Sequence, residues 1–157
     1  MPSERSERQR VKVVIDTVIF IRALIKPRGY NSEIVRRIDE FELFISEDIL
    51  KELLDVLYRS NLKKKYDPSG IISISNILNI LSEATIITPS QKIEICRDPH
   101  DNKFIECAIA AGANYIISGD EDLLNIKEYG NVKIIRIDTF LKILDSLSAD
   151  QPIEFEK

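Results

Sequence analysis

The sequence contains one histidine, two cysteines and no tryptophan. A single histidine, His100, is too few for the clustered ligands of a Cys/His zinc site, and Cys96 and Cys107 do not make a disulfide framework. No apolar run is long enough to span a bilayer, and the first ten residues are polar and charged, unlike a secretory signal. We therefore expect a reduced, cytoplasmic protein without a membrane segment.

An excess of positive charge is also missing. The net charge of −4 excludes electrostatic binding of nucleic acid by the molecule as a whole, although a local basic patch remains compatible with it. The candidate RNA-binding residues form one run, and a solvated surface segment is an equally good interpretation of it: Lys63, Lys64 and Lys65.

What is present is typical of one globular domain. The 157 residues are 44% hydrophobic and 31% charged, which is enough to bury a core. We expect the domain to span residues 11–147, between a flexible N-terminal tail at 1–10 and a C-terminal tail at 148–157.

Short apolar runs alternate with stretches of helical spacing along the chain. The runs predict five strands, at residues 11–15, 42–45, 85–88, 115–118 and 132–137. The spacing predicts helices at 31–39, after Ser46, after Asp67-Pro68, from 101 or 102 to Gly112, and from 138 or 139 to 147. This alternation indicates a three-layer α/β/α fold around a mostly parallel five-stranded sheet.

Four acidic residues stand where such a fold places functional sites, beyond the carboxyl ends of the strands. Asp16 directly follows the first strand, and Asp120 lies two residues beyond the fourth. Asp101 begins the helix before the fourth strand, and Glu52 lies about two turns into the helix after the second. We expect the four side chains to meet on one rim of the sheet.

Converging carboxylates repel one another, and the neighbouring sequence offers too little positive charge to offset that repulsion. A divalent cation would offset it, and carboxylate oxygens suit Mg²⁺ or Mn²⁺. Such a centre can bind a phosphodiester, activate a water and stabilise a leaving oxygen. The residues therefore favour metal-assisted hydrolysis.

Simpler interpretations compete for several of these residues. Asp101 alone fits a helix cap better than a ligand, Asp122 fits a first-turn acid, and Asp98 fits a turn former before proline. His100 fits an exposed loop histidine better than a catalytic one. Asp16 is harder to dismiss, because a carboxylate in a largely buried setting needs a reason.

Four segments together resemble the PIN-domain family, over residues 11–144. They are Val-Val-Ile-Asp-Thr at 13–17, Ser-Glu-Asp-Ile-Leu-Lys-Glu-Leu at 46–53, Asp-Pro-His-Asp-Asn-Lys-Phe-Ile-Glu-Cys-Ala at 98–108, and Tyr-Ile-Ile-Ser-Gly-Asp-Glu-Asp-Leu-Leu at 115–124. Each is weak alone, but their order and spacing are fairly specific. The segment from 98 to 124 resembles the subgroup associated with toxins of toxin–antitoxin systems.

The resemblance implies an Mg²⁺- or Mn²⁺-dependent endoribonuclease with an RNA substrate, often a homodimer, and for toxin members a protein antitoxin that holds it inactive. The implied catalytic and metal-binding residues are Asp16, Glu52, Asp101 and Asp120, with Asp122 as an auxiliary metal ligand and Thr17 and Ser118 as supporting hydroxyls.

One departure leaves a second hypothesis open. The family commonly has Asn after Asp-Thr, where this chain has Val18, which has no side-chain group to hydrogen-bond Asp16. A catalytically weak or inactive PIN-fold module that binds RNA or a protein is therefore the alternative.

A third class, an aspartyl-phosphate protein such as a receiver domain, fits less well. It needs paired acids near the first strand end and a lysine after the last strand, whereas Asp16 stands alone and Asp138 and Thr139 follow the last strand.

Overall fold

The computed structural model describes residues 10–25, 29–59 and 74–150. The predicted RNA-binding residues Lys63, Lys64 and Lys65 and the helix start at Asp67 lie outside this part of the chain. Most of both predicted tails lies outside it too.

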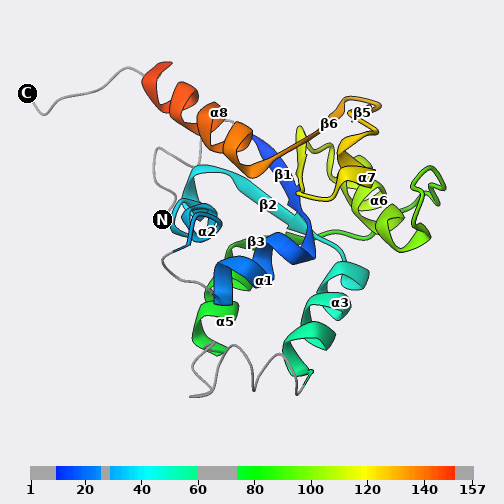
Figure 1. The fold of residues 1–157 in the computed structure, drawn as a ribbon, viewed down its shortest axis with the longest axis horizontal. Helices are drawn as coiled ribbons and strands as arrows, with labels where there is room; N and C mark the ends of the chain where they lie inside the picture. Colours follow the sequence, from blue (N-terminus) through cyan, green and yellow to red (C-terminus); the bar gives the residue numbers. More distant parts are fainter. Residues whose placement is uncertain (1–9, 26–28, 60–73, 151–157) are drawn as a thin grey trace, which may run out of the picture.

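The centre of the molecule is a six-stranded sheet with the strand order β3-β2-β1-β4-β6-β5 (Figure 1). Its strands are β1 (Lys12–Ile15), β2 (Glu42–Ile45), β3 (Ala84–Ile86), β4 (Tyr115–Ile117), β5 (Glu128–Tyr129) and β6 (Val132–Ile135). The first four and β6 pair in parallel, and β5 runs antiparallel to β6. The prediction of a mostly parallel sheet is confirmed, with one short edge strand more than the five expected.

Helices cover both faces of the sheet, which confirms the three-layer architecture. They are α1 (Thr17–Ile25), α2 (Ser32–Arg36), α3 (Glu47–Tyr58), α5 (Ile74–Glu83), α6 (Asn102–Ala111), α7 (Glu121–Leu124) and α8 (Ile137–Asp150), with short 3-10 turns at Ile38–Glu40 and Pro99–Asp101. No helix in the described ranges is long and apolar enough to cross a membrane.

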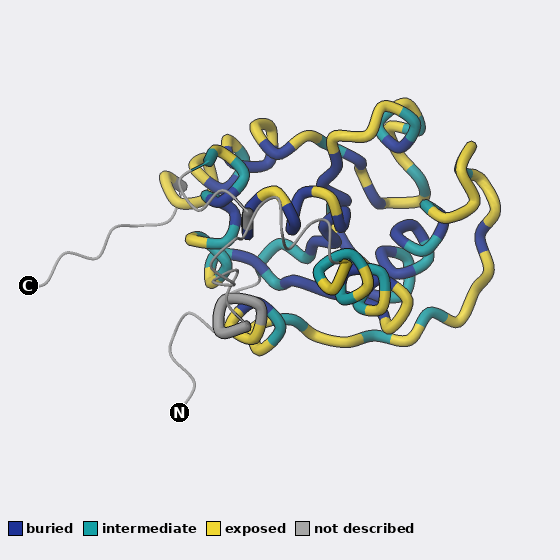
Figure 2. The backbone as a smooth tube through the Cα atoms, turned by 60° about the horizontal axis from the view of Figure 1, so that its bottom comes forward, coloured by how far each residue is buried: buried dark blue, intermediate teal, exposed yellow. Residues whose placement is uncertain are grey.

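Alternation along β1 divides the core in two. Val13 and Ile15 pack into a cluster with α1, α2, α5 and α8, whereas Val14 packs into a cluster with α6 and α7. Helix α3 contributes to both, through Leu53 on one side and Ile49 on the other. A strand with neighbours on both edges and helices on both faces is buried along most of its length, as Val13, Val14 and Ile15 are. Figure 2 shows that the buried stretches lie in the interior of the molecule.

Two predicted helix ends are confirmed by their caps. The Ser46 hydroxyl accepts a hydrogen bond from the Ile49 N–H at 3.3 Å and begins α3. Gly112 ends α6 in the left-handed conformation, with φ of 64°, which glycine adopts at little cost.

Other boundaries differ from the sequence prediction. Helix α1 was not predicted, because its β-branched residues have low helix propensity; burial of Ile19, Phe20 and Leu24 decides its structure. The helix expected at 31–39 divides into α2 and a 3-10 turn, and Asn31 makes no side-chain cap. The last strand ends at Ile135, and α8 extends to Asp150.

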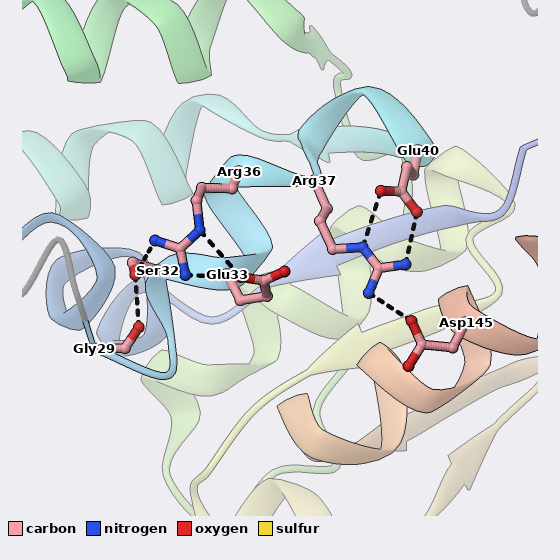
Figure 3. Close-up of polar contacts among 7 residues, drawn as sticks. All are labelled: Gly29, Ser32, Glu33, Arg36, Arg37, Glu40 and Asp145. Atoms are coloured by element: carbon pink, nitrogen blue, oxygen red, sulfur yellow. Dashed lines mark hydrogen bonds and ion pairs between the residues drawn. The ribbon is translucent and has the colours of Figure 1, made fainter.

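Two arginines form hydrogen bonds and ion pairs in α2 and in the 3-10 turn that follows it, as Figure 3 shows. Arg37 donates to both carboxylate oxygens of Glu40, at 2.9 and 2.8 Å, and to Asp145 of α8 at 2.8 Å. These carboxylates raise the pKa of Arg37. Arg36 donates to Glu33 and to the Ser32 hydroxyl. A planar guanidinium suits such forked contacts, and that of Arg37 joins the segment after α2 to α8.

Candidate active site

All four predicted acids line one cavity of about 420 Å³ at the carboxyl ends of β1 and β4. The residues that line it also include Thr17, Val18, Arg22 and Gly119. The topology explains the meeting: β1 and β4 are neighbours in the sheet, so the loops that follow them leave from adjacent points. The expectation of a shared rim is met; the catalytic roles of the four acids remain predictions.

Asp16 is built into the centre of the sheet and is only 6% exposed. Its N–H donates to the Ile117 carbonyl at 2.9 Å, which prolongs the β1–β4 pairing by one residue. Burial raises the pKa of Asp16 and the charges of Asp120 and Glu52 raise it further, while hydrogen bonds from Ser118 and Val18 lower it, with a net upward shift.

The support for Asp16 comes from two donors. The Ser118 hydroxyl donates to Oδ2 at 2.8 Å, as its predicted supporting role requires. The backbone N–H of Val18 donates to Oδ1 at 3.1 Å. The Val18 side chain is 48% exposed and lines the cavity. A backbone group therefore supplies a hydrogen bond to Asp16 even though the family's usual Asn is missing.

Asp101 lines the cavity from the N-cap position of α6. Its side chain makes no cap hydrogen bond, and Asp98 caps the 3-10 turn instead by accepting from the His100 N–H at 3.0 Å. The predicted position of Asp101 at the helix start is therefore confirmed, a side-chain cap by Asp101 is wrong, and the turn interpretation of Asp98 is confirmed. Burial, followed by the charges of Asp120, Asp98 and Asp16, raises the pKa of Asp101 to about 6.

Asp120 is held by the loop that follows β4. Its N–H donates to the Ser118 hydroxyl at 3.0 Å, and its Oδ1 accepts from the Asp122 N–H at 3.0 Å and so caps α7. Asp122 does not line the cavity and has Arg97 at 3.7 Å as its partner. The structure therefore places Asp122 as a first-turn acid of α7, apart from the other four.

Glu52 differs from the three aspartates because one of its partners is a cation. The Thr17 hydroxyl donates to Oε1 at 2.6 Å, and Lys103 Nζ lies 3.1 Å from Oε2. Thr17 therefore supports Glu52, not Asp16. The expectation that the acids have no basic partner is wrong for Glu52. Lys103 was missed, although it stands two residues after Asp101 in the sequence.

The donors around the cavity fit a hard divalent cation. Asp16, Asp101 and Asp120 offer only oxygen atoms, and the raised pKa values of the first two reflect burial and uncompensated negative charge. In the described part of the chain, no three His, Cys, Asp or Glu side chains already form a metal-binding group. Mg²⁺ commonly takes one or two carboxylates and keeps several waters, so an open cavity suits it better than a closed cage.

A family model described as a PIN domain matches residues 12–122, which include all four acids. The chain belongs to the PIN-domain family. This PIN domain is 38% identical over 128 residues to the uncharacterized protein MJ1680 of Methanocaldococcus jannaschii, a match that covers 80% of this chain and 81% of that protein.

Two solved structures share the PIN fold at low sequence identity. PAE2754 from Pyrobaculum aerophilum has a TM-score of 0.57 at 15% identity, covering 87% of this chain and 90% of its own. VapBC2 from Rickettsia felis, solved bound to a DNA fragment from their promoter, has a TM-score of 0.54 at 20% identity, covering 80% and 98%. At these identities the likeness supports the fold.

Proposed function

We propose that this PIN domain is an Mg²⁺- or Mn²⁺-dependent endoribonuclease that hydrolyses phosphodiester bonds of RNA in the acid-lined cavity. The observation that carries the proposal is the meeting of Asp16, Asp101 and Asp120 in one cavity, where no described lysine or arginine pairs with them. Together with membership of the family, this favours metal-assisted hydrolysis over the other chemistry of carboxylates.

Asp16, Asp101 and Asp120 would hold the ion, which supplies an activated water and stabilises the leaving oxygen. The protein's own part is to keep the carboxylates in place. Ser118 fixes two of them at once, by donating to Asp16 and accepting from the Asp120 N–H. Arg22 is exposed and lines the same cavity, so it is the proposed contact for an RNA phosphate.

The proposal extends to the setting of the enzyme. A protein antitoxin is the proposed partner, supported by the likeness to VapBC2 and by the resemblance of residues 98–124 to toxin members. We further propose a cytoplasmic homodimer, a domain at residues 11–147 between tails at 1–10 and 148–157, and RNA contacts through Lys63, Lys64 and Lys65.

The decisive experiment replaces the most buried acid. Asp16→Asn keeps the size of the side chain and removes its charge, so we expect an intact fold and no Mn²⁺-dependent cleavage of a labelled RNA. Asp138→Asn is the matched control, because it removes an exposed acid at the start of α8 that does not line the cavity, and it should leave cleavage unchanged. Undiminished cleavage by Asp16→Asn would remove the mechanism.

The alternative, a binding module without activity, has Val18 in its favour. The hydrogen bond from the Val18 N–H to Asp16 weakens that argument, since part of the support is present without Asn. The two candidates differ in metal binding, because an ion that binds only the folded state raises the melting temperature. An unchanged melting temperature with millimolar Mn²⁺ favours the binding module.

A further inference from the structure

Lys103 holds its ammonium in a fixed place beside the acid cavity. Its side chain is only 14% exposed, although lysine is rarely buried. The ammonium lies 3.1 Å from Glu52 Oε2, donates to the His100 carbonyl, and lies 5.2 Å from the centroid of the Phe104 ring. These partners come from the turn before α6, from α6 and from α3, so the charge is set between two helices.

Glu52 is correspondingly neutralised. One of its oxygens accepts from Thr17, and the other faces the Lys103 ammonium, whose positive charge offsets the negative charge of the carboxylate. Asp16 also has a donor at each oxygen, but both donors are uncharged and leave its negative charge without an offset. Glu52 lines both the acid cavity and an adjoining groove of about 760 Å³, which Lys103 also lines. The Glu52–Lys103 pair therefore stands at the boundary between the two spaces.

The other acids have no such cation. Among the described residues, no lysine or arginine forms an ion pair with Asp16, Asp101 or Asp120. Negative charge that is not offset is therefore concentrated on the three aspartates. The cavity has one end that attracts a divalent ion and one end that is already neutralised.

We propose that Lys103 is a built-in counter-cation that limits the cavity to one divalent ion, held by the three aspartates. This inference rests on the proposed function only for the existence of the metal site. A second ion beside Glu52 would have to displace an ammonium that has three partners. Lys103 is thus a positioning residue: it acts through Glu52 and sets the number of ions that the site takes.

Metal stoichiometry tests the inference without any measurement of cleavage. Mn²⁺ is titrated into the metal-free full chain, and bound ions per chain are counted by calorimetry and by electron paramagnetic resonance. We expect one ion in the unaltered protein and two in Lys103→Met, which keeps the length of the side chain and frees Glu52. Lys103→Arg, which restores the charge, and Lys51→Met, which removes an exposed charge beside Glu52, should each bind one ion.

A second variant covers the case in which Lys103→Met does not fold. Glu52→Gln should still bind one ion, with little change in affinity, because Glu52 is not a ligand of that ion. A loss of tenfold or more in affinity would overturn the inference. In the folded double variant Lys103→Met/Glu52→Gln, the second ion should be lost again.

The failures of the two proposals are distinguishable. Two ions in the unaltered protein, one ion in folded Lys103→Met, or two ions in Lys103→Arg would overturn the role of Lys103 while leaving a metal site that Asp16→Asn abolishes. No bound Mn²⁺ in any variant would overturn the proposed function, and the inference with it.

Discussion

Ser118→Ala tests how far the site depends on a single hydroxyl. Ser118 is fully buried, donates to Asp16 Oδ2 at 2.8 Å and accepts from the Asp120 N–H at 3.0 Å. Its removal leaves a carboxylate oxygen and a backbone N–H without these partners. A hydrogen bond to a charged group contributes about 1.5–3 kcal/mol. Since about 1.4 kcal/mol is a factor of ten, Mn²⁺ affinity should fall by about ten- to a hundredfold.

The assay is calorimetric titration of Mn²⁺ into the metal-free variant, at a pH well above the pKa of Asp101. Ser46→Ala is the matched control, because Ser46 is equally buried but caps α3. Loss of that cap should lower the free energy of unfolding by about 0.5–2 kcal/mol and leave Mn²⁺ affinity unchanged. Equal Mn²⁺ affinity in Ser118→Ala and the unaltered protein would refute the assignment of Asp16 as a supported ligand.

Three further predictions address pH, packing and RNA binding. The pKa of Asp101 is raised from 3.8 to about 6 and that of Asp16 is also raised, so the unfolded chain loses these protons at lower pH than the folded chain does. The free energy of unfolding of the metal-free protein should therefore fall between about pH 4 and 6. Thermal melts with a chelator measure this, and a flat or rising stability over that range would contradict it. Asn102→Ala removes the side-chain oxygen that accepts hydrogen bonds from two backbone N–H groups in residues 87–98. The free energy of unfolding, measured by denaturation, should fall by about 1–3 kcal/mol, and limited digestion should cleave that segment faster. An unchanged digestion pattern would argue against Asn102 as an anchor of the segment. Arg22→Ala should weaken RNA binding and lower the slope of log affinity against log salt by about one, with Mn²⁺ binding unchanged; an unaltered slope would exclude a phosphate contact.

Much of the fold could be predicted because the central strands carry an unambiguous pattern. Strand β1 is buried on both faces, so its run of Val and Ile identifies it without any knowledge of its neighbours. The parallel topology then places Asp16 and Asp120 at one rim. Strand β5 could not be predicted in the same way, since two residues are too few to show alternation. Only the pairing with β6, through a turn with Gly130 at φ of 59°, defines it.

Two contacts of the site that sequence reasoning missed join segments distant in sequence, whereas the error on Asp101 is local. The start of α6 gives Asp101 the pattern of a side-chain cap, but its side chain makes no cap hydrogen bond and lines the cavity, and Asp98 caps the 3-10 turn before α6. The pairing of Glu52 with Lys103 joins α3 to α6, and the sequence of neither helix predicts that the two are in contact. The hydrogen bond from Thr17 to Glu52 likewise joins α1 to α3. Residue type and topology predict which groups meet, whereas partner choice depends on the packing of the helices.

Under the proposed function, the place of Asp16 would link the lifetime of the protein to its metal supply. Its N–H donates to β4 and its carboxylate accepts from two donors, so the side chain stays in its buried position, away from water, when the ion is missing. Under the proposed function, an ion that binds only folded chains adds to the free energy of unfolding. Chains made when divalent metal is scarce would then open more often and be degraded first. The amount of nuclease in a cell would thus follow the availability of its own cofactor.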